Sequence, residues 1–517
     1  MVRIRCYGGL NEIGGNKFFL DFKKGSLILD FGQTFRGEGY YFEEFLQPRS
    51  TSKLHDLLQL GLLPNLNNIY RQDAMRPKNF HKHSFTGKNL WETGLNSYEE
   101  AVEGGERVPD GVFVSHAHAD HCGYLCYLGD FPVYSSETSW KLMKAISDVG
   151  NLTGFDAQLT EVRPKSIQKL KGGYFPGELK SEYEKPGFPR ECNHLENNSE
   201  ITTENGIFIT GFSVDHSLPG SMACLIEADS KQILYTGDLR FHGRSGTDLG
   251  EKLRGLKPDT MICEGTRIRE TEPDDEYQVE RDLTDLIETC PGLVMVGFAW
   301  KDLDRYETVK KATLNNGRIP VFDPRLSYTL ARLDRCIYDE EASTFLERTD
   351  SMLYSKGDYT NSKHKIGLIP CDEWDSKTKT CCTRHFDDGV KVTDIRSDPD
   401  QYVLHMDYFR FKNLLDIQPP PGSLYVRAQC EPFNLRMEIS EEKMKKWLRH
   451  FKINPNNNYE PIQIHASGHA SGTEINQMIK KIKPKTLIPV HTEHPYEFKN
   501  RDGLIKIPNY CKPIYLN

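Results

Sequence analysis

The sequence predicts an α/β protein, and two patterns support this fold class. In the first half, short apolar segments with strand-like composition recur, and several end in a His or Asp followed by a turn. From about residue 270 the sequence pattern changes to alternating helix-like and strand-like segments, which is typical of βαβ units with a parallel sheet. We therefore expect a strand-rich part followed by an α/β part.

The first half is predicted from its apolar runs and from the Gly, Asn and Asp residues between them. The predicted strands are 3–7, 18–22, 26–30, 112–115, 206–210, 223–228 and 232–235. A helix is expected at Cys122–Leu128, directly after a His-rich loop. Residues 36–108 and 160–205 are mixed or polar and are predicted to be additions to this frame, the second one made of surface loops.

The second half is predicted from periodicity that switches between helix and strand. The predicted elements are helix 276–289, strand 293–297, helix 303–314, strand 319–322, strand 462–465, helix 472–482 and strand 486–490. The helix at 472–482 has the clearest start, because Ser471 and Glu474 have the spacing of a capping box.

Composition limits the class of protein. The chain has 517 residues with a net charge of -8, and no apolar run approaches the roughly 18 residues of a membrane span. We therefore expect no membrane partner, and the 13 cysteines without a Cys-x-x-Cys pair predict a reducing cytoplasm. A zinc knuckle at Cys371, Cys381, Cys382 and His385 is a weak alternative, since its spacing matches no standard pattern. The acidic balance lacks the basic footprint that proteins with a nucleic-acid partner usually carry, so it predicts weak non-specific binding and contacts confined to a cleft.

The strongest signal is the run His116-Ala-His118-Ala-Asp120-His121 after an apolar strand. In extended backbone, His116 and His118 project to the same side, so one metal ion can bind both imidazoles. As the chain turns into a helix, Asp120 and His121 can face a second ion. This loop offers four ligands, which is too few for two ions.

Three further ligand candidates each follow an apolar strand and precede a turn. They are His216, Asp238 and His491. Each one alone is more often a hydrogen-bonded structural residue. Together with the His116–His121 run they complete a two-metal set. Glu493, two residues beyond His491, either orients a ligand or is simply exposed.

The order of these motifs resembles the metallo-β-lactamase fold, and Asp30, which closes its strand before a Gly, resembles the first motif of that fold. The insertion between Asp238 and His491 is long, and Glu264 and His469 within it resemble motifs of the β-CASP group. Gly8–Gly14 and Pro489–His491 most resemble ribonuclease J and its archaeal relatives.

The resemblance implies an αββα metallo-β-lactamase sandwich with an inserted α/β domain. The implied domains are 1–268 (metallo-β-lactamase, first part), 269–454 (β-CASP insertion) and 455–517 (closing part). It also implies two zinc ions, with manganese left open. Their implied ligands are His116, His118 and His216 for one ion, Asp120, His121 and His491 for the other, and Asp238 as a bridge.

Ser467-Gly468-His469 precedes the N-terminus of the predicted helix at 472–482, where backbone N–H groups favour an anion. We expect a phosphate-binding loop here, or else a tight structural turn. If the loop binds phosphate, we expect His469 to contact the scissile phosphate or to protonate the leaving oxygen, and Glu264 to orient the His469 ring. Asp120 is the alternative acid.

The function implied is a two-metal, ribonuclease J-like phosphodiesterase acting as exonuclease or endonuclease on single-stranded RNA, as a homodimer. A DNase of the same group and a small ester or thioester hydrolase are the alternatives. Residues 402–415 lack the Gly- and Ser-rich character of ribonuclease J, which leaves the 5′-end preference open.

Overall fold

The structure is a computed structural model. It describes residues 2–43, 45–78, 93–150, 152, 154–169, 179–184, 187–272, 275–333, 390, 392–432 and 435–516. The Cys371–His385 cluster lies outside the described residues. Among the described residues, no helix combines the length and the apolar character that crossing a membrane requires.

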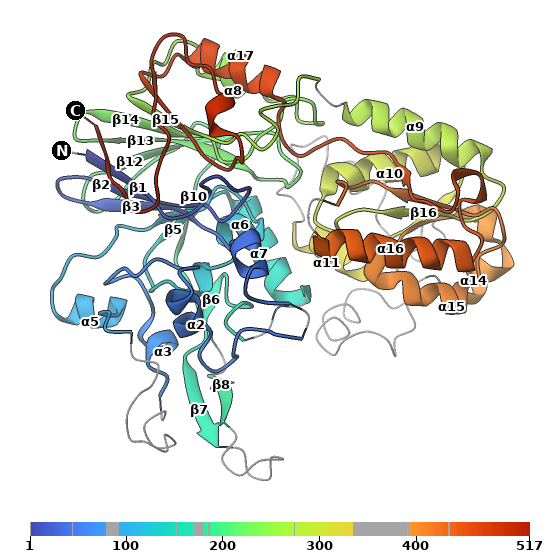
Figure 1. Ribbon diagram of the computed structural model, residues 1–517, viewed down its shortest axis with the longest axis horizontal. Coiled ribbons are helices and arrows are strands. Elements are labelled where there is room, and N and C mark those ends of the chain that lie inside the picture. The colour runs from blue at the N-terminus through green and yellow to red at the C-terminus, as the bar shows by residue number, and fades with distance from the viewer. Residues whose placement is uncertain are drawn as a thin grey trace.

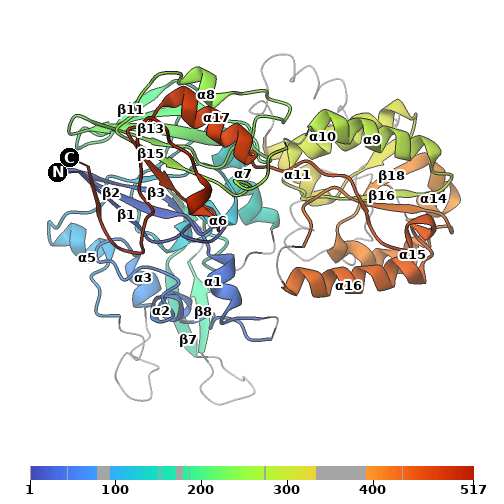
Figure 2. The ribbon, with the colours of Figure 1, turned by 45° about the horizontal axis from the view of Figure 1, so that its top comes forward.

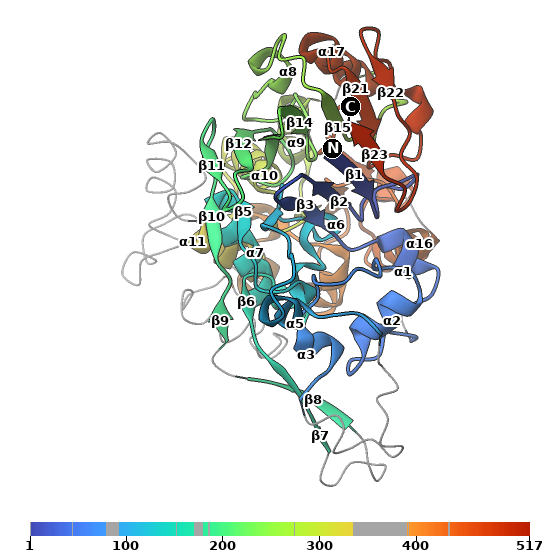
Figure 3. The ribbon, with the colours of Figure 1, turned by 90° about the vertical axis from the view of Figure 1, so that its left-hand side faces the viewer.

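The first of two seven-stranded sheets contains the N-terminus. Its order is β10-β5-β4-β3-β2-β1-β23, with β1 antiparallel to both neighbours and β3, β4, β5 and β10 parallel. The strands are β1 (Val2–Cys6), β2 (Lys17–Asp21), β3 (Ser26–Phe31), β4 (Val112–Phe113), β5 (Val133–Ser135), β10 (Cys192–His194) and β23 (Ile514–Leu516). Because β23 pairs with β1, the two ends of the described chain lie side by side (Figure 3).

The second seven-stranded sheet has the order β11-β12-β13-β14-β15-β21-β22. Its strands are β11 (Glu200–Thr202), β12 (Phe208–Ser213), β13 (Met222–Ala228), β14 (Lys231–Tyr235), β15 (Thr260–Cys263), β21 (Thr486–Pro489) and β22 (Leu504–Ile505). The pairing of β15 with β21 is parallel and joins segments that are far apart in sequence. The closing segment of the chain therefore completes this sheet.

The two sheets pack face to face through one apolar layer. Ile4 and Leu29 from the first sheet share a buried cluster with Ile226 and Ile233 from the second. Helix α17 (Gly472–Ile482) covers the outer face of the second sheet through Ile475, Met478, Ile479 and Ile482. Full burial of side chains of this size contributes about 1.5–3 kcal/mol each. The predicted capping box of Ser471 and Glu474 is present.

Helices cover the outer face of the first sheet as well, which gives four layers (Figures 1 and 2). The helices before the inserted sheet are α1 (Phe35–Gly39), α2 (Lys53–Gln59), α3 (Gln72–Met75), α5 (Tyr98–Glu103), α6 (Ala119–Cys122), α7 (Glu137–Val149) and α8 (Leu249–Lys252). Of these, α8 packs beside α17 on the second sheet. Two small hairpin-like sheets stand outside the layers and pair β6 (Glu161–Val162) with β9 (Phe188–Pro189) and β7 (Lys165–Lys169) with β8 (Leu179–Tyr183).

A third sheet consists of five parallel strands. In sequence these strands come after β15 and before β21, so they interrupt the strands of the second sheet. The order of the third sheet is β17-β18-β16-β19-β20, formed by β16 (Val294–Gly297), β17 (Ile319–Val321), β18 (Tyr402–His405), β19 (Leu424–Arg427) and β20 (Ile462–Gln463). The helices around it are α9 (Glu276–Thr289), α10 (Leu303–Asn315), α11 (Pro324–Arg332), α14 (Val392–Ser397), α15 (Leu414–Ile417) and α16 (Leu435–His450). They cover both faces of the sheet (Figure 1).

The predicted fold class, an α/β sandwich with an inserted α/β domain, is confirmed. The boundary predicted at 455 stays a prediction, although β20 pairs with β19 of the inserted sheet and not with the sandwich. Two predictions differ from the structure. The described part of 160–205, predicted to be surface loops, contains strands β6 to β11, because β10 and β11 pair with β5 and β12 at the edges of the two main sheets and the others pair among themselves. One helix is also misplaced. Helix α6 spans Ala119–Cys122 and is followed by a 3-10 turn at Leu125–Tyr127, whereas a single helix was expected at Cys122–Leu128. The helix starts inside the His-rich run because His118 is its extended N-cap residue.

Candidate metal centre

The predicted ligands come together at one edge of the sandwich, where strands of both sheets end. His116–His121 follow β4 of the first sheet, whereas Asp238 follows β14 and His491 follows β21 of the second. His216 follows β12. The site therefore depends on packing between the sheets, since neither sheet carries the complete set.

One group of ligand atoms consists of three imidazole nitrogens. Nδ1 of His118 lies 2.9 Å from Nε2 of His116 and 3.1 Å from Nε2 of His216. A tetrahedral zinc ion with Zn–N bonds of about 2.05 Å holds its nitrogens roughly 3.3 Å apart. Burial lowers the pKa of His118 to about 3 and holds the pKa values of His116 and His216 well below the usual range. Three neutral imidazoles facing one point fit a metal ion.

A second group contains Asp120, His121 and His491, whose ligand atoms also lie close together. Nε2 of His491 is 3.2 Å from Oδ2 of Asp120, and Nε2 of His121 is 3.9 Å from the same oxygen. Oδ2 of Asp238 lies between the two groups, 3.0 Å from Nε2 of His121, 3.5 Å from Nε2 of His491 and 3.8 Å from Nε2 of His116. Asp238 is thus placed to contact ions in both positions.

Two buried atoms in this centre make no hydrogen bond with any residue that the structure describes, although one of them lies 3.0 Å from Oδ2 of Asp238. They are Nε2 of His121 and Oδ1 of Asp238. Buried polar atoms in native structures are almost always satisfied, so such a pair indicates a missing binding partner. The two atom types are also ones that divalent transition metals bind. The donor set therefore fits a metal site.

Asp30 fixes the orientation of this loop from beneath. Its carboxylate accepts hydrogen bonds from the Ser115 amide (2.7 Å), the Ser115 hydroxyl (2.8 Å), the Tyr235 hydroxyl (2.6 Å) and Nδ1 of His121 (2.7 Å). Because Nδ1–H of His121 points at Asp30, Nε2 is left to face the centre. Asp30 has a φ of +52°, a strained conformation that its four hydrogen bonds maintain.

Two other imidazoles, His216 and His491, are oriented in the same way. Nδ1 of His216 donates to the Gly468 carbonyl at 2.5 Å. Nδ1 of His491 lies 2.8 Å from Oγ1 of Thr266, which in turn donates to Glu264 at 2.9 Å. Ser115, Tyr235 and Thr266 were not predicted. Only Ser115 and Thr266 stand next to a predicted motif, and Tyr235 carries no signal beyond its place at the end of a strand.

His469 and Glu264 form a pair beside the metal ligands. Nδ1 of His469 lies 3.1 Å from both carboxylate oxygens of Glu264 and 4.0 Å from Oδ2 of Asp238. Burial opposes the imidazolium, but the carboxylates of Glu264, Asp238 and Asp120, with Glu264 contributing most, together outweigh burial and raise the pKa of His469 to about 9. Since Nδ1–H is held by Glu264, Nε2–H is free for another acceptor.

The predicted loop Ser467-Gly468-His469 is held close to the ligands. Oγ of Ser467 accepts the His469 amide at 3.1 Å, and Gly468 has no room for a side chain, since a Cβ would lie 2.9 Å from Oγ of Ser217 and 3.2 Å from the His216 ring. His242 supports the loop from outside, with Nε2 3.0 Å from the Ser467 carbonyl. Glu493 does not reach the ligands. Its carboxylate pairs with Arg36 at 2.9 Å and is about half exposed.

Comparisons with known proteins agree with this geometry. Residues 86–279 match the metallo-beta-lactamase superfamily, and residues 458–498 match the Zn-dependent metallo-hydrolase RNA specificity domain. The chain is 21% identical over 540 aligned residues to "Ribonuclease J" of Mycoplasma genitalium, covering 99% of this chain and 70% of that protein. It is 20% identical to "Ribonuclease J" of Mycoplasma pneumoniae, covering 95% of this chain and 68% of that protein.

The similarity in structure extends over the whole chain. A solved structure titled "Crystal Structure of a Protein of Unknown Function from Enterococcus faecalis V583" superposes with a TM-score of 0.65 and 18% identity, covering 99% of each chain. This match supports the fold alone. The recognition made from the motifs is confirmed by the two family matches and by the similarity to proteins named ribonuclease J. Residues 86–279 thus resemble the metallo-beta-lactamase superfamily, and the chain as a whole is similar to proteins named ribonuclease J.

Proposed function

We propose that this chain is a two-metal phosphodiesterase that hydrolyses single-stranded RNA. The observation that carries the proposal is the pair of adjoining ligand groups with Asp238 between them and the His469–Glu264 pair directly beside them. The match to an RNA specificity domain and the similarity to proteins named ribonuclease J support RNA as the polymer. Two ions side by side suit phosphoryl transfer, in which both the attacking and the leaving oxygen need charge stabilisation.

His116, His118 and His216 would hold one ion, and Asp120, His121 and His491 the other, with Asp238 between them. We propose zinc as the metal because imidazole and carboxylate ligands suit it, and manganese is the alternative that the same ligands allow. Divalent ions in these positions supply Lewis acidity and neutralise the charge that develops on the phosphate.

The residues of the chain supply positioning and a proton. His469 presents Nε2–H while Glu264 holds Nδ1, so the ring can bind a phosphate oxygen or donate its proton to the leaving sugar oxygen. Asp120, with Oδ2 3.2 Å from Nε2 of His491, is the alternative acid. The Ser467–Gly468 turn keeps His469 beside the ligands, because the Gly468 carbonyl also accepts the hydrogen bond from His216.

Cleavage of end-labelled substrates tests the proposal. Single-stranded RNA and DNA with a 5′-monophosphate, 5′-triphosphate or 5′-hydroxyl are incubated with the metal-loaded protein, and product lengths distinguish exonuclease from endonuclease action. We expect RNA cleavage that His469→Ala reduces about 10²–10⁴-fold. His450→Ala, an exposed histidine on α16, is the matched control and should cleave normally.

The alternatives give different results in the same assay. Cleavage of DNA but not RNA would assign the chain to the DNases of the group. If no polymer is cut while metal is bound, and a small ester or thioester is hydrolysed, the proposal is wrong.

A further inference from the structure

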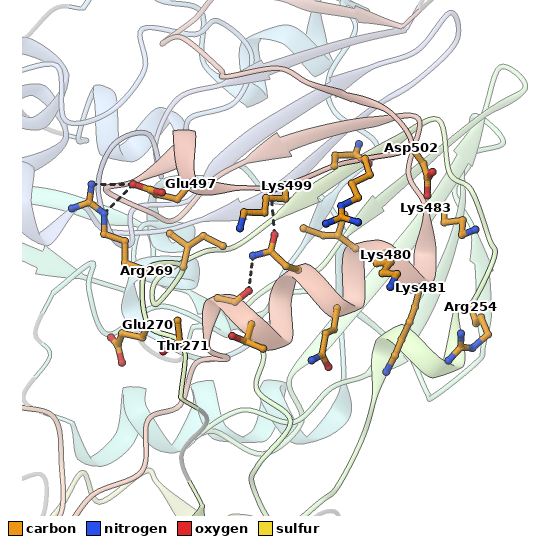
Figure 4. A pocket seen from close by; sticks show the side chains of 18 residues that line it. Arg254, Arg269, Glu270, Thr271, Lys480, Lys481, Lys483, Glu497, Lys499 and Asp502 are labelled. Carbon is orange, nitrogen blue, oxygen red and sulfur yellow. Dashed lines mark hydrogen bonds and ion pairs between the residues drawn. The ribbon is translucent and has the colours of Figure 1, made fainter.

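A basic groove lies on the outer side of the sandwich, away from the metal ligands. It has a volume of about 1110 Å³ and runs between the exposed face of α17 and the segment 497–502 (Figure 4). Seven of its lining side chains are Lys or Arg and three are Asp or Glu. This excess of positive charge contrasts with the chain as a whole, which has 66 basic against 74 acidic residues.

Part of this positive charge is neutralised within the protein. Arg254 pairs with Glu251, Arg269 pairs with Glu497, and Lys481 pairs with Asp248 at 2.7 Å. These cations are partly compensated and hold the walls of the groove together. Their contribution to binding an anion is therefore small.

Four cations in the groove are different. Lys480, Lys483, Lys499 and Arg501 are exposed and make no ion pair with any residue in the described part of the chain. They come from the last turn and the C-cap of α17 and from the segment after Phe498. Four uncompensated charges along one groove are the arrangement that binds a polyanion, since each can replace a counterion of a phosphate.

The groove is joined to the metal centre by the loops that carry it. Helix α17 begins three residues after His469, and the Gly472 amide donates to the Glu270 carbonyl at 2.8 Å. Nη1 of Arg267 donates to the His469 carbonyl at 3.2 Å. The loop that starts at Glu264 thus lines the groove at one end and the catalytic pair at the other.

We propose that this groove binds the sugar–phosphate backbone of an RNA strand outside the metal centre. The inference rests on the proposed function, and it adds a second contact region for the same polymer. Helix α17 has 11 residues, a length of about 16 Å, which spans roughly five phosphates at the ~3.4 Å spacing of a stacked strand. Among the residues that the structure describes, no aromatic side chain lines the groove. Contacts there are consequently to phosphate, independent of base sequence.

Salt dependence of RNA binding tests the proposal. The groove variant carries K480Q, K483Q, K499Q and R501Q. The control variant carries K443Q, K446Q, R449Q and K452Q, which removes three lysines and one arginine from exposed positions on and just after α16. Both variants change the net charge equally. The probe is a fluorescent single-stranded RNA with phosphorothioate linkages that resist cleavage, and its affinity for each metal-loaded protein is measured by anisotropy between 50 and 200 mM KCl.

We expect the groove variant to lower the slope of log affinity against log salt by about 2.8, at roughly 0.7 per phosphate contact of a single strand. Over this salt range the wild type should then lose about 50-fold more affinity than the groove variant. The α16 control should keep the wild-type slope. A variant in which each of the four residues is replaced by the other basic residue (Lys→Arg or Arg→Lys) should have the wild-type slope.

The outcomes separate the two proposals. Equal slopes for the wild type and the groove variant, or equal losses in both variants, overturn the groove proposal and leave RNA cleavage untouched. A groove-dependent slope in a protein that cuts no RNA supports the groove and refutes the proposed function. Groove-dependent binding to phosphatidylglycerol vesicles or to polyglutamate, with no groove-dependent binding of RNA, assigns the groove to another partner and overturns the proposal.

Discussion

Replacement of Asp30 by Asn is the most direct test of how the metal loop is held. The change is isosteric, yet only an ionised carboxylate can accept all four of the donors that surround it. The oxygen Oδ2 alone accepts the Ser115 hydroxyl, the Tyr235 hydroxyl and Nδ1 of His121. If the amide nitrogen introduced by Asp30→Asn takes the place of Oδ2, it is itself a donor, and it cannot accept a hydrogen bond from any of these three groups. Removing one partner from a buried charged network costs about 3–5 kcal/mol, a large part of the 5–15 kcal/mol that typically stabilises a protein.

The same substitution should weaken metal binding. Without its acceptor, His121 no longer keeps Nδ1–H turned toward Asp30, and Nε2 loses its orientation toward the centre. Loss of such a supporting hydrogen bond lowers metal affinity about 10–100-fold. Guanidinium unfolding of the chelated protein measures stability, and competition with a chromophoric chelator measures affinity for zinc.

Two further variants make the result decisive. Asp21→Asn is the same chemical change at the end of β2, where the carboxylate pairs with Arg5 near the surface, and should cost less than about 1 kcal/mol. Tyr235→Phe removes one donor and keeps the carboxylate, so it should fold even if Asp30→Asn does not. The reasoning is refuted if Asp30→Asn is as stable as Asp21→Asn and binds zinc within threefold of the wild type.

Three other predictions follow from the same geometry. In the metal-free protein, a proton NMR titration should show His469 with a pKa near 9, and Glu264→Gln should lower this pKa because the carboxylate is lost while burial still disfavours the imidazolium. Since the pKa of His469 is raised on folding, this pair stabilises the fold below about pH 6.5, and that contribution disappears as pH rises toward 9. A difference in melting temperature between the wild type and Glu264→Gln that does not change with pH would contradict this contribution of the His469–Glu264 pair to stability. Gly32→Ala should abolish metal binding, because its Cβ would lie 1.6 Å from the Asp120 carbonyl oxygen, whereas Gly39→Ala meets no atom within 4 Å and should bind normally. Chelation should abolish hydrolysis and lower the melting temperature, and added zinc or manganese should restore both. Unchanged melting after chelation would contradict a metal between the two sheets.

The elements with strong local signals were predictable from the sequence. Helices 276–289 and 472–482 have the expected bounds, since a side-chain cap marks the start of each and periodic apolar residues fill its buried face. Helix α6 was misplaced because its start depends on the conformation of His118 and not on a recognisable capping side chain.

The predicted ligands could be found because each combines a chemical type with the end of an apolar strand. The contacts that orient them could not, since they join residues far apart in the chain. Tyr235 reaches Asp30 across the interface between the sheets. Glu493 was a reasonable candidate by sequence distance, but its pairing with Arg36 of α1 depends on tertiary packing alone.

The pairing of β15 with β21 has a consequence for the order in which the protein becomes active. His491 enters the centre only when the closing segment has docked beside Thr260–Cys263. During synthesis from the N-terminus, every residue of the inserted domain leaves the ribosome before this last ligand does. A nascent chain with six of the seven ligands has an open position at the centre.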